Sequence, residues 1–140
     1  MQRALLDTDI LSEILKRKAP TVIRNATKYA SIHKRYTFTA VSVHEIYYGL
    51  ESKGAIQQLQ KARVALAAHE IIVPILSDYE VAGLIRGKAR KQGCQLAIDD
   101  CLIAAVAGRL GLSIVTGNTS HFRDIQDAGL PITIDNWREI

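Results

Sequence analysis

The sequence predicts a single α/β domain in which a mostly parallel central sheet lies between two layers of helices. Short apolar segments alternate with longer segments whose apolar residues recur at helical spacing, in the order βααβααβααβ with a late edge strand. Strands separated by helices within one domain favour parallel pairing, with helices on both faces of the sheet. A length of 140 residues is enough for one such core without a linker.

The first half of the chain supplies two predicted strands and the helices that follow them. Residues 4–6 are all apolar and predict a buried strand, and a helix follows over about 9–18. Pro20 suits the first turn of the next helix, which continues to residue 35. Residues 36–41 are rich in β-branched and aromatic side chains, which favours a second strand.

The second half repeats this alternation. Gly54 and Gly93 are typical of helix ends, and the β-branched segments between the helices predict further strands. Strands are expected over 71–75, 113–116 and 131–134, and helices over 42–54, 55–70, 77–93 and 98–111.

Composition excludes several classes of protein. Hydrophobic residues make up 48% and charged residues 23%, as in a compact globular domain and unlike a disordered chain. No apolar stretch approaches the roughly 20 residues that span a bilayer, and the first acid comes too early for a signal peptide, so we expect a cytoplasmic protein without membrane contact. Cys94 and Cys101 form no metal-binding pattern and are expected to be buried, reduced thiols. The net charge of +4 is a mild indication of a polyanionic partner.

Acidic residues occupy the positions where such a sheet would gather a functional site. Asp7 and Asp9 follow the first strand, Glu45 follows the second, and Asp99 and Asp100 open the helix before strand 113–116. Sites in sheets of this kind lie beyond the carboxyl ends of the strands. Convergent carboxylates repel one another unless a cation joins them. Oxygen ligands without thiolates favour Mg²⁺ or Mn²⁺ over zinc.

The same acids also have a purely structural interpretation. Asp9 or Asp99 at a helix N-terminus accepts backbone N–H groups and complements the helix dipole. For Glu45 the alternative is a capping box that starts at Ser42, and the segment from Ser77 repeats that pattern with no evident chemistry. Capping alone, however, does not explain why the acids would converge at one edge of the sheet.

Four segments carry a resemblance to a known family. "LLDTDIL", "SVHEIYYGLE", "IDDCLIAAVAGRLGLSIVTGNTSHF" and the closing "NW" resemble PIN-domain ribonucleases of the VapC toxin type over nearly the whole chain. The resemblance implies a PIN-like α/β/α sandwich over residues 1–140. It also implies a metal-dependent endoribonuclease, in which metal-activated water hydrolyses RNA and leaves 5′-phosphate and 3′-hydroxyl ends. The implied partners are an RNA substrate, a cognate antitoxin protein and a second copy of the chain.

The resemblance assigns roles residue by residue. Asp7, Glu45 and Asp100 match the acids that hold Mg²⁺ or Mn²⁺ in the family. The chain departs from the family pattern by placing Asp9 where Asn is usual. It departs again by having no acid shortly after strand 113–116. The residues cast as auxiliary ligands or supports are Thr8, Asp9, Asp99, Thr116 and Asn118.

Basic and histidine side chains are weaker candidates. His44 adjoins Glu45, and His121 is expected in a loop near Asn118. Each histidine has two interpretations: a role in substrate binding or proton transfer, or a structural role in packing and hydrogen bonding. A basic run on the helix over 77–93 either contacts RNA phosphates or forms a solvated face. The residues of this run are Arg86, Lys88, Arg90 and Lys91.

Rival functions remain at this stage. A haloacid-dehalogenase-like phosphatase shares the DxD after a strand, but Leu11 stands where that family needs Thr or Val. A nucleotide-binding P-loop is excluded because Ala89 replaces the Ser or Thr that binds Mg²⁺. A non-catalytic PIN scaffold that binds RNA or protein, and a PIN nuclease of RNA maturation, are the remaining alternatives. The RNA target is not encoded in any motif.

Overall fold

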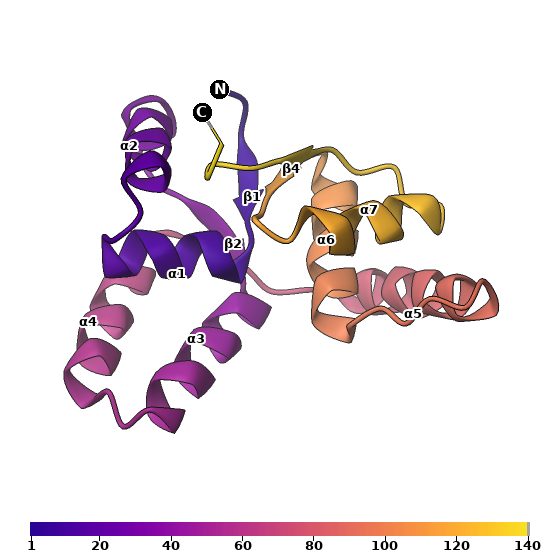
Figure 1. The fold of residues 1–140 in the computed structure, drawn as a ribbon, viewed down its shortest axis with the longest axis horizontal. Coiled ribbons are helices and arrows are strands. Elements are labelled where there is room, and N and C mark those ends of the chain that lie inside the picture. Colours follow the sequence, from indigo (N-terminus) through magenta and orange to yellow (C-terminus); the bar gives the residue numbers. More distant parts are fainter. Residues whose placement is uncertain (140) are drawn as a thin grey trace.

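The computed structural model describes residues 1–139 and confirms the predicted α/β sandwich (Figure 1). Five strands and seven helices lie within this range. The strands are β1 (Ala4–Leu6), β2 (Thr37–Thr39), β3 (Glu70–Ile72), β4 (Ser113–Val115) and β5 (Ile134–Asp135). The helices are α1 (Thr8–Lys16), α2 (Pro20–His33), α3 (Ala40–Ser52), α4 (Ile56–Ala67), α5 (Leu76–Lys91), α6 (Ile98–Leu110) and α7 (Thr119–Asp127).

The strands form one sheet in the order β3-β2-β1-β4-β5, and every pairing is parallel. Leu5 pairs with Thr37 of β2 on one side and with Ile114 of β4 on the other, so β1 is central. The chain builds outward from β1 to β3 and then crosses to β4. The strand order therefore reverses between β1 and β4, and this switch point is where ligands bind in sheets of this type.

Two helical layers cover the sheet (Figure 1). Leu5 points toward α5, α6 and α7, where it packs with Ile114, and α6 contributes an unbroken run of buried residues from Cys101 to Ala107. Leu6 points the other way, toward α1 and α2. The α3–α4 hairpin packs on α1 and on Phe38 of β2. Both faces are thus buried, as a parallel sheet requires.

Three helices begin earlier than the sequence patterns predict. Helix α1 starts at Thr8, so its N-cap is Asp7 and not Asp9. Helix α3 starts at Ala40, which places Ser42 inside the helix and makes the capping box from Ser42 to Glu45 wrong. Helix α5 starts at Leu76, and the capping pattern predicted from Ser77 is likewise not formed. The strands before α3 and α5 end sooner than their apolar patterns suggested, whereas β1 ends at Leu6 as predicted.

Helix α7 was not predicted, because its first residues follow Gly and Asn and resemble a loop. Phe122 and Ile125 are its buried residues, and they pack into the core around α6. His121 is therefore on a helix and not in a loop. Both cysteines are free, but only Cys101 is buried and Cys94 is partly exposed. None of the helices within residues 1–139 is long and apolar enough to span a membrane.

Candidate active site

Asp7 lies at the switch point, where the backbone leaves β1 and enters α1. Its Oδ1 accepts the Thr8 N–H at 2.8 Å, and its Oδ2 accepts the Thr116 hydroxyl at 2.8 Å. Thr116 directly follows β4, so this contact joins the ends of the two central strands. The side chain is only 4% exposed. Asp7 is therefore a buried carboxylate fixed by two donors at the carboxyl end of the sheet.

Thr8 connects this point to Glu45 on α3. Its hydroxyl lies 2.7 Å from Glu45 Oε1 and 2.8 Å from Ser42 Oγ. A hydroxyl has one hydrogen, so Thr8 donates to the carboxylate and accepts from Ser42. The serine that sequence patterns assigned to a cap is instead fully buried and supports this network.

Asp99 and Asp100 lie in the first turn of α6, where the helix dipole favours negative charge. Asp100 is partly buried, and its Oδ2 lies 3.3 Å from Nδ1 of His121, which is exposed on α7. The structure thus brings His121 to a predicted ligand, whereas the ring of His44 stacks on Tyr48 along the exposed side of α3.

The three predicted ligands share an electrostatic signature. The pKa of Asp7 is raised to about 7, chiefly by burial and then by the negative charge of Asp9. Burial also raises the pKa of Glu45, and the nearby charges of Asp99 and Asp100 add to this increase, although the hydrogen bond from Thr8 opposes it. Burial raises the pKa of Asp100 as well, although His121 opposes the effect. Asp100 acts on both other acids, so all three belong to one electrostatic cluster.

Comparison with known proteins decides the family. Residues 4–128 match the PIN domain. The chain belongs to the PIN-domain family. It is 24% identical to a protein named ribonuclease VapC2 from Haemophilus influenzae, over 98% of this chain and 99% of the relative. The resemblance to VapC-type PIN domains deduced from the sequence is thereby confirmed.

Solved structures agree on the fold. A VapBC2 complex from Rickettsia felis, bound to a DNA fragment from its promoter, matches with a TM-score of 0.80 and 22% identity, covering 97% of this chain and 99% of that one. A DNA-bound VapBC from Salmonella typhimurium matches with a TM-score of 0.78 and 24% identity, covering 98% and 99%. This PIN domain therefore has the fold of the toxin–antitoxin structures it resembles.

The auxiliary residues of the PIN domain fall into two groups. Asp9 reaches across to the loop after β4, where its Oδ2 accepts the Gly117 N–H at 2.9 Å. Thr116 supports Asp7 and also accepts the N–H of Asn118 at 3.0 Å. Asn118 itself is exposed at the N-cap of α7. Asp9 and Thr116 thus contact the centre of the site, whereas Asn118 lies at its edge.

The donor set suits a hard divalent cation. It consists of carboxylate and hydroxyl oxygens, and neighbouring carboxylates raise the pKa of each predicted ligand, although His121 opposes this effect at Asp100. Within residues 1–139, no three acidic, histidine or cysteine side chains already stand in position around one ion. Each predicted ligand is held instead by its own neighbour, namely Thr116, Thr8 or His121. Shared coordination by Asp7, Glu45 and Asp100 stays a prediction.

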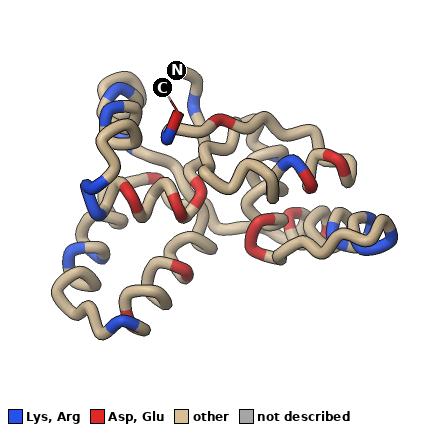
Figure 2. Tube along the Cα trace, in the orientation of Figure 1, with Lys and Arg blue, Asp and Glu red and all other residues tan. Residues whose placement is uncertain are grey.

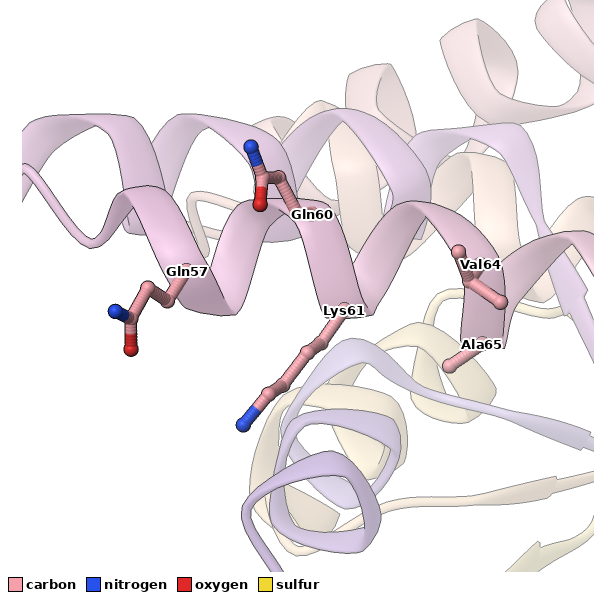
Figure 3. A pocket seen from close by; sticks show the side chains of 5 residues that line it. All are labelled: Gln57, Gln60, Lys61, Val64 and Ala65. Carbon is pink, nitrogen blue, oxygen red and sulfur yellow. The ribbon is translucent and has the colours of Figure 1, made fainter.

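Among residues 1–139, none of the four residues of the basic run on α5 forms an ion pair with the acids. Figure 2 shows basic residues at the end of α5 that lies away from the acidic start of α6. All four residues are exposed, and Arg86 donates to the Leu96 carbonyl at 3.1 Å. A shallow cavity of about 650 Å³ on α4 has no acidic residue in its lining, which consists of Gln57, Gln60, Lys61, Val64 and Ala65 (Figure 3). Sequence reasoning missed the contacts of Ser42 and Arg138, for which no local motif gives a signal.

Proposed function

We propose that this PIN domain is a Mg²⁺- or Mn²⁺-dependent endoribonuclease, with Asp7, Glu45 and Asp100 as the metal ligands. The observation that carries this proposal is the cluster of one buried and two partly buried carboxylates with raised pKa at the switch point of the sheet. A bound divalent cation would supply charge neutralisation and lower the pKa of a hydrolytic water. The name of the Haemophilus relative, a ribonuclease, supports RNA as the substrate.

The chain's own residues position this chemistry. The Thr8 hydroxyl fixes the Glu45 carboxylate, and the Thr116 hydroxyl fixes Asp7. Asp9 adds a carboxylate beside the loop at Gly117, which follows β4. Many VapC-type proteins carry an acid shortly after that strand, so we assign to Asp9 the role of compensating for its absence here.

The proposed biological role is that of a toxin neutralised by a cognate antitoxin. The solved relatives named VapBC are toxin–antitoxin complexes. Two of them match 97% and 98% of this chain. A homodimer and a cytoplasmic location remain part of the proposal. Growth arrest on expression, relieved by a small protein encoded beside this gene, tests it. Unchanged growth with an active nuclease would favour a role in RNA maturation.

Cleavage of cellular RNA by the purified protein tests the enzymatic proposal. We expect discrete fragments with 5′-phosphate ends in Mg²⁺ or Mn²⁺, and none in EDTA. The Glu45→Gln variant, purified in parallel, controls for contaminating nucleases, because it keeps the size of the side chain. Intact RNA under every condition, together with RNA or protein binding, would support the non-catalytic scaffold instead.

Thr8 is expected to matter through its hydroxyl alone. Thr8→Val keeps the shape of the side chain but removes the hydrogen bond to Glu45 Oε1. We expect the rate of cleavage to fall about tenfold, as for other residues that orient a metal ligand. Thr8→Ser keeps the hydroxyl and is the matched control. Equal activity of the two variants would show that Thr8 serves only the helix.

A further inference from the structure

The C-terminal segment delivers one arginine to the acidic site. Trp137 is 3% exposed and packs 5.4 Å from the ring of Tyr29, measured between ring centroids. Asn25 of α2 donates to the Trp137 carbonyl at 3.0 Å, and the Thr116 N–H donates to the Asp135 carbonyl at 2.9 Å. These contacts anchor the backbone just before Arg138, so the position of Arg138 is fixed by the fold.

The guanidinium of Arg138 is held by two carboxylates through Nε and Nη2. Its Nε donates to Glu13 Oε1 at 2.9 Å, and its Nη2 lies 2.5 Å from the same oxygen and 3.4 Å from Asp9 Oδ2. Among residues 1–139, Nη1 has no hydrogen-bond partner. The side chain is 41% exposed. Glu13 and Asp9 therefore orient the group, which stays partly exposed to solvent.

Gly117 makes room for this arrangement. A Cβ at position 117 would lie 2.0 Å from Nη1 of Arg138 and 2.4 Å from its Cζ. Gly117 does not have a positive φ angle, so its backbone conformation does not demand glycine. The absence of a side chain is instead explained by the close approach of the arginine.

An acidic site that acts on RNA needs cations besides its metal, because carboxylates repel the phosphates they must approach. Within residues 1–139, Arg138 is the one Lys or Arg that forms an ion pair with Asp9 or Glu13, and its charge also acts on Asp7. Arginine binds phosphate through its planar fork of donors and keeps its charge at any physiological pH.

We propose that Arg138 contacts the substrate directly, and that its oriented, partly exposed guanidinium binds a backbone phosphate of the RNA beside the acidic site. The inference rests on the proposed RNA substrate. It is separate from the chemistry of cleavage, because phosphate binding needs no metal. It gives the C-terminal segment a role in recognition that Trp137 secures by packing.

The test is binding of a fluorescein-labelled single-stranded RNA to metal-free protein over a series of salt concentrations. An Asp7→Asn background prevents cleavage. We expect Arg138→Gln to weaken binding about tenfold and to reduce the slope of log K against log salt by about 0.7, the value for one lost phosphate contact on a single strand. Arg138→Lys should keep the slope, because it keeps the charge. Arg24→Gln, an exposed charge change on α2, controls for net charge.

An unchanged slope and affinity for Arg138→Gln would overturn the inference and leave Arg138 as a structural partner of Glu13 and Asp9. Failure of the Asp7→Asn protein to bind the RNA would overturn it as well. Wild-type cleavage in Mg²⁺ is measured on the same RNA. Binding that depends on Arg138 without any cleavage would therefore reject the nuclease while keeping the phosphate contact.

Discussion

Replacing Asp7 by Asn is expected to abolish RNA cleavage while raising the melting temperature of the metal-free protein. Asn keeps an oxygen for the Thr8 N–H and an amide group for Thr116, so the fold and the helix cap survive. It removes the negative charge on which cation binding depends. We expect the cleavage rate to fall on the order of 10³-fold, as when a central electrostatic group is lost from an active site.

The gain in stability follows from the pKa of Asp7, which rises from 3.8 to about 7 on folding. A raised pKa means that the folded state favours the protonated carboxyl, so wild-type stability falls as the pH rises from about 4 to about 7. Above that range the ionised carboxylate destabilises the metal-free protein by about 2 to 4 kcal/mol. Asn carries no such charge, so the variant should not show this decline.

Thermal melting in EDTA across this pH range measures the effect. The Asp7→Asn variant should be the more stable protein near pH 8 and equal to wild type near pH 4. Glu80→Gln, the same chemical change at an exposed position on α5, is the matched control. A variant less stable than wild type at every pH would show that the Asp7 carboxylate is a favourable cap and not a repelled charge.

Removal of Arg109 should give the largest loss of stability. Asp78, 1% exposed, accepts Nε and Nη2 of Arg109 at 2.9 Å each, and also the Ile75 N–H. This pair joins the start of α5 to the end of α6. Arg109→Met leaves the carboxylate buried with only its backbone donor. We expect the melting temperature to fall by about 10 °C, because an unpaired buried charge is costly.

The pH dependence of the melting temperature of the Arg109→Met variant shows whether the unpaired charge of Asp78 causes the loss of stability. Burial alone would raise the pKa of Asp78, but the hydrogen bonds from Arg109 and Ile75 lower it below its usual value. The wild-type pair therefore contributes stability above the ordinary pKa of an aspartate and loses it as the pH falls through the folded value. Without Arg109, Asp78 should favour its protonated form. Lowering the pH should therefore narrow the difference in melting temperature between the variant and the wild type. A constant difference at all pH values would indicate lost packing instead.

The sequence predicts those features of the fold that depend on local pattern. The apolar residues 4–6 and the β-branched segments predict strands, and their alternation with helices places Asp7, Glu45 and Asp100 at one edge of the sheet. The starts of α3 and α5 could not be predicted from Ser42 and Ser77, because strand length is set by pairing with neighbours and not by capping residues.

Contacts between distant parts of the chain could not be predicted either, because no local pattern encodes them. Arg138 and Glu13 are 125 positions apart, and no local pattern links them. Thr8 and Glu45 were both singled out, but their hydrogen bond depends on the angle between α1 and α3. Helix α7 has only two buried residues, too few to distinguish its amphipathic pattern from a loop. Local pattern thus indicated which acids belong to the site, whereas the hydrogen bonds that hold them depend on how the helices pack together.

Titration calorimetry with Mn²⁺ tests the central claim most directly, namely that Asp7, Glu45 and Asp100 form one cation site. The proteins to compare are wild type, Asp7→Asn, Glu45→Gln, Asp100→Asn and, as a neighbouring control, Asp99→Asn. We expect substitution of each of the three predicted ligands to weaken Mn²⁺ binding at least about tenfold. Asp99→Asn, which removes a charge that acts on Glu45 and Asp100, should weaken it less. Mn²⁺ binding that survives all three substitutions, or that depends on Asp99 and not on Asp100, would contradict the account.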